Sequence, residues 1–311
     1  MPVDDGGIAG SICADSPVFC RKKGFAQVGA SRLQGWRGDF VRPVEVSEKM
    51  IGKLSSQAIK LVARGFAILG SGKLCYACNK RVGRFLPYRG GWKDVPPLIR
   101  VLDVIGSDVE NFSCPRCGAH DRERHLLMYF DHAEVWQKIE RGNVLHFAPE
   151  PILAVRIVNA RPARYIKADL FPAAPEITRE DITKLSFGDC TFDLVIANHV
   201  LEHVMDDHAA MKEIFRVLKP GGLAVLQTPY SDKLTNTFED EGICEDEARL
   251  QAFGQEDHVR LYGKDLFSRL GSVGFIPRVL KHDVVLKNYG ESFYGVNPRE
   301  PFICMRRPAA V

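Results

Sequence analysis

Residues 181–204 read D-I-T-K-L-S-F-G-D-C-T-F-D-L-V-I-A-N-H-V-L-E-H-V, and residues 216–222 read R-V-L-K-P-G-G. The apolar run Phe192–Ala197 is typical of a strand that is buried on both faces. Asp206 and Asp207 follow it, where their carboxylates could cap a helix and face its positive end. We therefore expect a buried strand and then a helix.

The next segment has the periodicity of a helix and then of a strand. Apolar side chains recur at three- and four-residue spacing, at Met211, Ile214, Phe215 and Leu218. Pro220-Gly221-Gly222 would end this helix, and Leu223–Gln227 would form the following strand. A strand, a helix and a second strand in this order predict a right-handed crossover in a parallel sheet.

Three motifs in this stretch resemble class I S-adenosylmethionine-dependent methyltransferases of the type 11 kind. They are D-I-x-x-L-x-F from residue 181, F-D-L-V-I-A-N-H-V-L-E-H-V from residue 192, and R-V-L-K-P-G-G from residue 216. The resemblance covers roughly residues 121–311. It implies an α/β fold with a Rossmann-like sheet covered by helices on both faces, S-adenosylmethionine as cofactor, and methyl transfer as the activity.

Further elements flank the motifs. Helices are expected at Asp121–Lys138, with Asp121 as a candidate cap, and at Gly263–Leu270. Val279–Leu286 and Phe302–Met305 are expected to form a closing hairpin that is similar to the last two strands of the class I sheet.

Composition and charge suggest the domain organisation. We expect a flexible tail over residues 1–45, a basic helix and a cysteine module over 46–120, and the methyltransferase domain over 121–311. Residues 49–100 hold eleven Lys or Arg and one acid, although the whole chain has a net charge of only +3. This basic segment suits an anionic partner or is simply solvated. Its helix-like part, Ser47–Leu69, could pack on its own domain or lie on a membrane surface.

Four cysteines form two C-x-x-C pairs, Cys75 with Cys78 and Cys114 with Cys117. Two such pairs can place four thiolates tetrahedrally around one ion, so we expect a structural zinc site similar to a zinc ribbon. Iron, or two unrelated thiol pairs, are the alternatives. Unpaired thiols together with a metal site favour a reducing compartment, and we expect a cytoplasmic protein that has no membrane-spanning segment.

The first strand of the methyltransferase domain is expected at Asn143–Phe147. The family has a glycine-rich turn after this strand, whereas this chain reads Ala148-Pro149-Glu150-Pro151. The resemblance implies that Phe147, Ala148 and Glu150 contact the cofactor. Because S-adenosylmethionine has no phosphate, a small residue and a helix N-terminus facing the cofactor carboxylate would suffice. The alternative is an inactive fold.

The remaining cofactor residues are implied by the resemblance at the ends of later strands. Asp169 follows the expected strand Arg164–Ala168 and would accept hydrogen bonds from both ribose hydroxyls. Asp181 would receive the adenine amino group, and Ile182 would pack on the ring. Asn198 and His199 end the strand Phe192–Ala197, at the sheet edge where α/β folds bind ligands.

The segment between residues 229 and 260 is long and polar, as expected for substrate contacts or a lid. At its end, polar residues cluster without a packing period. We expect His258 to act as a general base, oriented by Asp257. The expected acceptor contacts are Gln255, Arg260 and Tyr262. The alternative is a helix cap with surface charge. Glu202 and His203 of the L-E-H motif are as well suited to a structural role.

The leading functional hypothesis is a methyltransferase that acts on a small molecule, a sugar or a surface-polysaccharide unit. A second hypothesis is an RNA methyltransferase that binds RNA through the zinc module and the basic segment 49–100. A third is a zinc-bearing binding protein on an inactive methyltransferase fold. The sequence leaves open whether translation starts at Met1 or Met50.

Overall fold

The computed structural model describes residues 64–65 and 67–309. The chain divides into two units, Met1–Asp39 and Phe40–Val311, and every described residue belongs to the second. The predicted tail 1–45, most of the predicted helix Ser47–Leu69 and the candidate start Met50 lie outside the described residues. Within the described part, no helix has the length and apolar character needed to cross a membrane.

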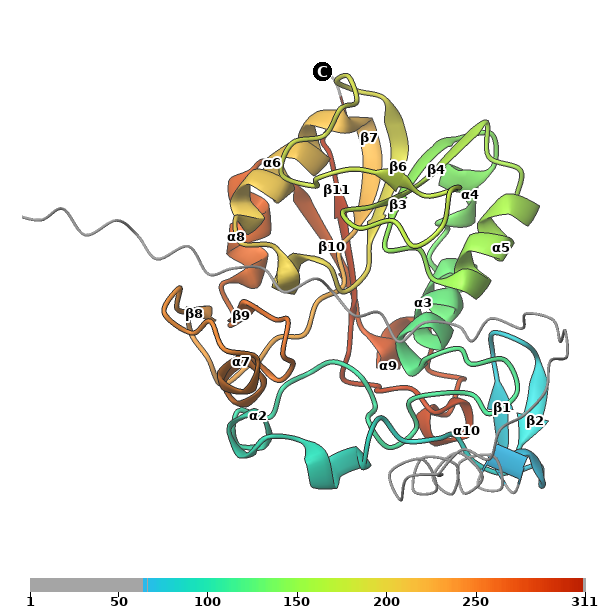
Figure 1. The fold of residues 1–311 in the computed structure, drawn as a ribbon. Helices are drawn as coiled ribbons and strands as arrows, with labels where there is room; N and C mark the ends of the chain where they lie inside the picture. The colour runs from blue at the N-terminus through green and yellow to red at the C-terminus, as the bar shows by residue number, and fades with distance from the viewer. Residues whose placement is uncertain (1–63, 66, 310–311) are drawn as a thin grey trace, which may run out of the picture. The chain divides into compact units, whose positions relative to one another are not determined.

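A seven-stranded sheet forms the centre of this unit, in the order β10-β11-β7-β6-β3-β4-β5 (Figure 1). Strand β11 runs antiparallel to both β10 and β7, and the other neighbours are parallel. This confirms the α/β Rossmann-like class and the closing antiparallel pair. The strands are β3 (Asn143–Phe147), β4 (Arg164–Asp169), β5 (Thr178–Arg179), β6 (Phe192–Ala197), β7 (Leu218–Val225), β10 (Ile276–Leu280) and β11 (Phe302–Arg306).

Helices cover both faces of the sheet (Figure 1). Side chains alternate between the faces, so that Leu145 and Val195 join one apolar core while Val144 and Leu194 join the other. The first core includes residues of α6 (Asp207–Val217) and α8 (Leu266–Ser272). The second includes residues of α3 (Asp121–His132), α4 (Trp136–Ile139) and α5 (Pro151–Asn159).

Shorter elements lie in the connections before and between these strands and helices. A small hairpin carries the first cysteine pair, and a second two-stranded pair, β8 with β9, lies within the predicted long polar segment. The short elements are β1 (Lys73–Cys75), β2 (Lys80–Val82), η1 (Gly91–Asp94), α2 (Pro97–Val101), η2 (Leu201–His203), β8 (Phe238–Glu239), α7 (Asp246–Phe253), β9 (Arg260–Leu261), α9 (His282–Val285) and α10 (Glu291–Tyr294).

The crossover from β6 to β7 is as predicted, with a shifted boundary. Asp206 caps α6, because its side chain accepts a hydrogen bond from the Ala209 amide at 2.8 Å. The helix ends at Val217, and β7 begins at once with Leu218, which pairs with Phe192. The expected strand Leu223–Gln227 therefore starts five residues too late, since Pro220-Gly221-Gly222 lies inside the strand and marks an irregular register.

Three other predicted elements need correction. The helix expected at Asp121–Lys138 is two helices, which separate near Glu134, a residue with a left-handed φ of 58°. His120, not Asp121, is the N-cap residue, and the Asp121 carboxylate instead accepts the amide of Asp108. The strand expected at Val279–Leu286 ends at Leu280, because α9 begins at His282. The helix expected from Gly263 starts at Leu266.

Arg124 on α3 joins the cysteine-containing loop to the C-terminal segment, and no sequence pattern marked it. Its side chain is fully buried, and its guanidinium lies 3.9 Å from the centre of the Phe85 ring. Every donor is used within 3.2 Å, on the carbonyl oxygens of Asn111, Phe112, Ala119, Tyr294 and Gly295. A planar fork of five N–H groups matches this set in a way that an ammonium group does not.

We predict that Arg124→Lys lowers the free energy of unfolding by about 2–4 kcal/mol, because Lys has three donors and leaves buried carbonyls without partners. Urea denaturation measures the change. Arg164→Lys, at an exposed arginine on β4, is the matched control and should stay within about 0.5 kcal/mol of wild type. Equal stability of the two variants would contradict the bonding role assigned to Arg124.

Candidate functional site at the carboxyl edge of the sheet

The carboxyl ends of β5, β4, β3 and β6 bring the predicted cofactor residues to one edge of the sheet. These strands are parallel neighbours, so their carboxyl ends face the same way. Backbone hydrogen bonds join the segments that leave the strands, from Ala148 to Ala168 at 2.9 Å, and from Glu180 to Asp169 at 3.0 Å. Parallel α/β sheets bind ligands at this edge, so the arrangement is that of a candidate binding site.

Two non-glycine residues at this edge have a left-handed backbone. Ala148, directly after β3, has φ 45°, and His199, two residues after β6, has φ 53°. Such values are uncommon for residues other than glycine. Residues in sparsely populated backbone regions cluster at functional sites, where the surrounding structure maintains them. Ala148 thus has a backbone conformation that favours glycine, at the position where the sequence lacks the family's glycines.

Glu150 fixes the loop that follows β3. Its carboxylate accepts a hydrogen bond from Asn198 and lies 2.9 Å from the Nε2 atom of His146. The Nδ1 atom of His146 lies 2.9 Å from the Tyr165 hydroxyl. Burial alone would raise the pKa of Glu150, but the contacts with His146 and Asn198 hold it below its ordinary value. The predicted cofactor residues Glu150 and Asn198 are therefore in direct contact.

The other predicted cofactor residues differ in their exposure and in the hydrogen bonds that they already make within the protein. Asp169 is partly exposed at the end of β4, and its carboxylate accepts the Phe171 amide at 2.8 Å. Asp181 is exposed and accepts both the amide and the hydroxyl of Thr183. Ile182 is only 6% exposed and joins the core beside Phe147.

A buried ion cluster lies beyond the end of β6. His199 has its Nδ1 atom 3.1 Å from Glu202 and its Nε2 atom 3.3 Å from Glu300. Burial and the charge of Arg122 would lower the pKa of His199, but the two carboxylates outweigh them and raise it. The cluster therefore places one imidazole ring between two carboxylates. Glu202 also accepts the hydroxyl proton of Thr228 at 2.9 Å.

The cluster continues through two more buried histidines. The second Glu300 oxygen lies 3.6 Å from Nδ1 of His125, and Nε2 of His125 lies 2.9 Å from Nδ1 of His282. His282 then contacts the Tyr289 carbonyl at 3.1 Å. No sequence pattern indicated this cluster, because its members come from distant segments and only His199 and Glu202 lie in a recognisable motif.

The predicted catalytic pair is arranged differently from the expectation. His258 is 3% exposed, and its Nδ1 atom lies 3.1 Å from the Phe253 carbonyl. Burial, with the charge of His203, lowers the pKa of His258 to about 3, so its ring is neutral near pH 7. Asp257 pairs with His203, whose Nδ1 atom lies 3.4 Å from its carboxylate. Asp257 therefore orients His203 and not His258.

The predicted acceptor contacts Arg260 and Tyr262 are engaged within the protein. Arg260 is 3% exposed and donates to Glu239 and to backbone carbonyls on either side of His203. Tyr262 is fully buried, and its hydroxyl donates to Asp207 at 2.7 Å. Both side chains hold the loop after β6 in place. Gln255 is partly exposed.

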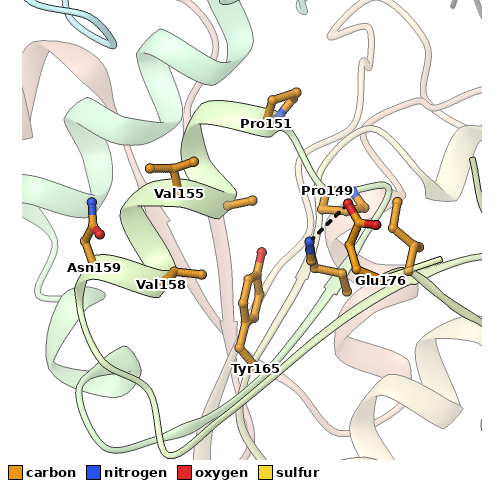
Figure 2. A pocket seen from close by; sticks show the side chains of 10 residues that line it. Pro149, Pro151, Val155, Val158, Asn159, Tyr165 and Glu176 are labelled. Atoms are coloured by element: carbon orange, nitrogen blue, oxygen red, sulfur yellow. Dashed lines mark ion pairs between the residues drawn. The ribbon is translucent and has the colours of Figure 1, made fainter. Parts of the chain in front are cut away.

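A cleft of about 400 Å³ opens beside α5, on the outer side of β4 (Figure 2). Its wall includes Pro149 and Pro151 of the loop after β3, and Tyr165 of β4. Lys167 and Glu176 form an ion pair across it at 3.8 Å. Pro149 and Pro151 flank the predicted cofactor residue Glu150. The cleft therefore lies next to the loop that would contact the cofactor.

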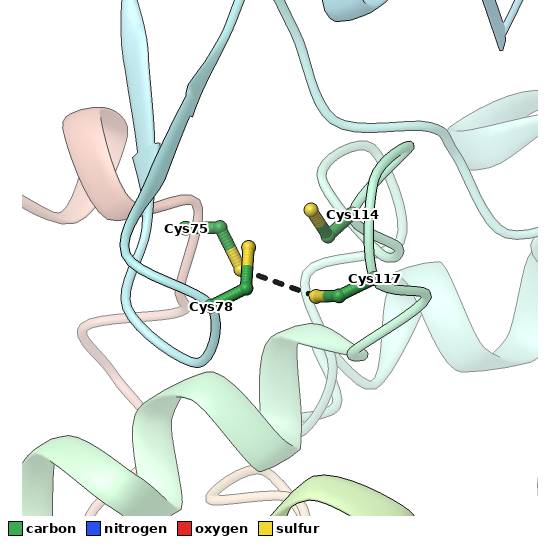
Figure 3. Close-up of side chains that lie close together, drawn as sticks. All are labelled: Cys75, Cys78, Cys114 and Cys117. Carbon is green, nitrogen blue, oxygen red and sulfur yellow. Dashed lines mark hydrogen bonds between the residues drawn. The ribbon is translucent and has the colours of Figure 1, made fainter.

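The four predicted metal-binding cysteines lie together, as Figure 3 shows. Their sulfur atoms lie within 4.8 Å of one another, and those of Cys75 and Cys117 are 3.7 Å apart. Four thiolates at about 2.3 Å from one zinc would be about 3.8 Å apart, so the cluster fits a tetrahedral site. The residue after each pair has a left-handed backbone, Asn79 with φ 53° and Gly118 with φ 81°. Both pairs therefore close tight turns.

Comparison with known proteins supports a class I methyltransferase domain. Residues 145–226 match the family model described as a methyltransferase domain. A demethylmenaquinone methyltransferase of Streptomyces avermitilis is 46% identical over 50 residues, which make up 16% of this chain and 22% of that protein. A 2-phytyl-1,4-beta-naphthoquinone methyltransferase of Arabidopsis thaliana is 42% identical over 59 residues, 19% of this chain and 23% of that protein. The chain thus aligns with less than a quarter of the length of either relative.

Among solved structures, an S-adenosylmethionine-dependent methyltransferase from Mesorhizobium loti is similar with a TM-score of 0.42. It is 16% identical, and the match covers 58% of this chain and 98% of that chain. The matched residues 145–226 run from β3 through β7, which includes the strand ends that carry the candidate site. This part of the chain is therefore similar to methyltransferase domains.

The buried cluster predicts a pH dependence of stability. Burial would raise the pKa of Glu300, but the facing His125 and His199 lower it from its ordinary value of 4.5 to about 2. Between these values the unfolded chain binds more protons at this group, so stability is lost as the pH falls. The loss attributable to Glu300 should reach about 3 kcal/mol between pH 5 and pH 2.

Glu300→Gln should remove this part of the pH dependence. Urea denaturation across that pH range measures it as the stability difference between wild type and variant, which should shrink as the pH falls. Glu291→Gln, at an exposed glutamate on α10, is the control and should follow the wild-type curve. A difference that stays constant from pH 5 to pH 2 would contradict a lowered pKa at Glu300.

Proposed function

We propose that this protein is a methyltransferase that binds S-adenosylmethionine at the carboxyl ends of β5, β4, β3 and β6 and transfers its methyl group to a small molecule. The family match over residues 145–226 supports the activity. The observation that carries the placement is the left-handed backbone of Ala148 and His199 at the ends of adjacent strands. Strained backbone at a sheet edge that binds ligands is the expected mark of a functional site.

In this proposal, Asp169 accepts the ribose hydroxyls and Asp181 the adenine amino group, with Ile182 against the ring. Asp169 suits the role because it is partly exposed and its carboxylate keeps acceptor capacity beyond the Phe171 amide. Phe147 and Ala148 would approach the methionine part. Glu150 and Asn198 would act together, since each already contacts the other.

The reaction needs little covalent chemistry from the protein. When bound, S-adenosylmethionine would supply the methyl group to an acceptor atom and would leave as S-adenosylhomocysteine, with the electron pair of the broken carbon–sulfur bond on sulfur. The protein supplies alignment and excludes water. His258 and Asp257 stay predictions for the acceptor side. With a pKa of about 3, His258 is a weak proton acceptor near pH 7, so it would contact the acceptor as a neutral ring.

A small-molecule acceptor is supported by the names of two relatives, a demethylmenaquinone methyltransferase and a 2-phytyl-1,4-beta-naphthoquinone methyltransferase. The sugar, polysaccharide and RNA alternatives stay predictions. Residues 49–63 and 66 of the basic segment 49–100, on which the RNA hypothesis and the membrane contact rest, lie outside the described residues. Residues Gln255, Arg260 and Tyr262 would shape the acceptor side through the loop that they hold.

We predict that Asp169→Ala weakens S-adenosylmethionine binding by about 1.5–3 kcal/mol, the usual contribution of hydrogen bonds to a charged group, and leaves the fold intact. Isothermal titration calorimetry with the cofactor measures the change. Asp283→Ala, at an exposed aspartate on α9, is the control and should bind as wild type. Unchanged affinity in Asp169→Ala would place the ribose elsewhere, and no binding by wild type would overturn the proposed activity.

We also propose that Cys75, Cys78, Cys114 and Cys117 hold one structural zinc ion. The sulfur spacing fits, and four protein ligands leave no open coordination position. Zinc would there join the hairpin of β1 and β2 to the loop that Arg124 contacts through Ala119. The site would therefore stabilise the residues before α3.

Purified protein is expected to contain zinc that depends on these thiols, as measured by elemental analysis. Cys117→Ser should lose that zinc and lower the melting temperature, because the binding energy of a structural site is folding energy. Cys190→Ser, at an exposed cysteine outside the cluster, is the control and should keep it. Equal zinc content in the two variants would rule out the four-cysteine site.

A further inference from the structure

A second group of metal-binding side chains lies at the carboxyl edge of the sheet, apart from the cysteines. Glu202, His203 and His258 each offer one ligand atom, and these atoms lie within 4.8 Å of one another. Glu202 and His203 belong to η2, and His258 precedes β9. A backbone hydrogen bond of 2.9 Å from the Val259 amide to the Glu202 carbonyl fixes the two segments together.

The contacts of the two rings orient them as metal-binding histidines are usually oriented. Nδ1 of His258 lies 3.1 Å from the Phe253 carbonyl. Nδ1 of His203 lies 3.2 Å from the Asp257 carbonyl and 3.4 Å from its carboxylate. A ring that donates from Nδ1 in such a contact presents Nε2 as its acceptor atom. Metal-ligating histidines almost always donate their other N–H to a carbonyl or carboxylate in this way.

One buried atom in the group has no partner. Nε2 of His258 makes no hydrogen bond with any described residue, although the His258 side chain is only 3% exposed. A buried polar atom left without a partner is unfavourable, and such atoms mark a bound water, an ion or a functional role. A ring that donates from Nδ1 to the Phe253 carbonyl has its lone pair on Nε2, and a cation would satisfy that lone pair.

The charges favour a cation in the same place. Glu202 is fully buried, and its carboxylate contacts His199 and the Thr228 hydroxyl. The carboxylates of Glu202 and Glu300 both face the ring of His199. Two carboxylates around one imidazole favour a cation beside Glu202.

We propose that Glu202, His203 and His258 bind one divalent first-row transition-metal cation. Two imidazoles and one carboxylate are a ligand set that suits zinc, manganese, iron or cobalt. Three protein ligands leave coordination positions open, which is typical of a catalytic site and not of a structural one. His203 is 23% exposed at its side chain, so the group can be reached from solvent.

The use of this cation rests on the proposed methyl transfer, whereas its binding does not. The site lies in the loop that leaves β6, three residues beyond His199. An acceptor hydroxyl bound to the cation would lose its proton more readily. That would supply the deprotonated acceptor that a neutral His258 is poorly suited to generate.

The test is a manganese titration of the full chain, followed by the electron paramagnetic resonance signal of free Mn²⁺. Manganese suits carboxylate ligands such as Glu202, whereas thiolates select softer metals, so the cysteines should not interfere. Wild type should show one saturable site per chain. His203→Asn and His258→Asn should weaken it by more than about 100-fold, and Asp257→Asn, which removes only a second-layer contact, by about 10–100-fold.

The exposed His208 provides the matched control, since His208→Asn should bind Mn²⁺ as wild type does. Circular dichroism checks that each variant folds. If His258→Asn does not fold, binding by His203→Asn decides the outcome, because His203 is partly exposed. The proposal is overturned if wild type shows no saturable Mn²⁺ site, or if His203→Asn binds as tightly as wild type. Cofactor calorimetry on the same samples separates the outcomes, because lost cofactor binding with intact Mn²⁺ binding removes the proposed function and leaves the cation site.

Discussion

The constraint on which the sheet edge depends is the pairing of buried charge. Glu202 and Glu300 are almost fully removed from water, and an isolated buried carboxylate is too costly to stay ionised. His199 lies between them with one ring nitrogen toward each. Losing His199 would leave the two buried carboxylates without the ring that they share, so the loop after β6 and the residues before β11 are fixed relative to each other.

This pairing also connects parts of the fold that the sheet alone leaves separate. Strand β7 lies between β6 and β11, yet the cluster reaches from His199 after β6 to Glu300 before β11, and through His125 to α3. Arg124, the neighbour of His125, holds the loop that carries the second cysteine pair. The candidate site, the cysteine module and the C-terminal strands thus meet at α3, so a change at the module could reach the site through one helix.

The sequence predicted the elements whose signal is local. Asn143–Phe147 and Phe192–Ala197 are short apolar runs, and the structure has both strands with those bounds. It did not predict where the distal helix α9 begins, because His282 is placed by its contact with His125, 157 residues away. In the same way, the early start of β7 depends on pairing with Phe192. Periodicity describes one segment at a time and cannot show such partners.

In the candidate site, the sequence likewise indicated which residues lie at the sheet edge but not which side chains contact one another. The order of the expected strands placed Asp169 and His199 at one edge, because parallel strands share their carboxyl ends, whereas Asp181 was implied by the family resemblance. The sequence could not show that Asp257 contacts His203, or that Arg260 donates its hydrogen bonds to Glu239 and to backbone carbonyls.

The observed contact of Asp257 with His203 changes the role expected of His258. A histidine oriented by an aspartate is a candidate base, whereas a neutral histidine bonded to a carbonyl is a candidate ligand. His258 belongs to the second kind, so the polar cluster in the sequence marked a site for binding an electron-pair acceptor more than one for taking up a proton.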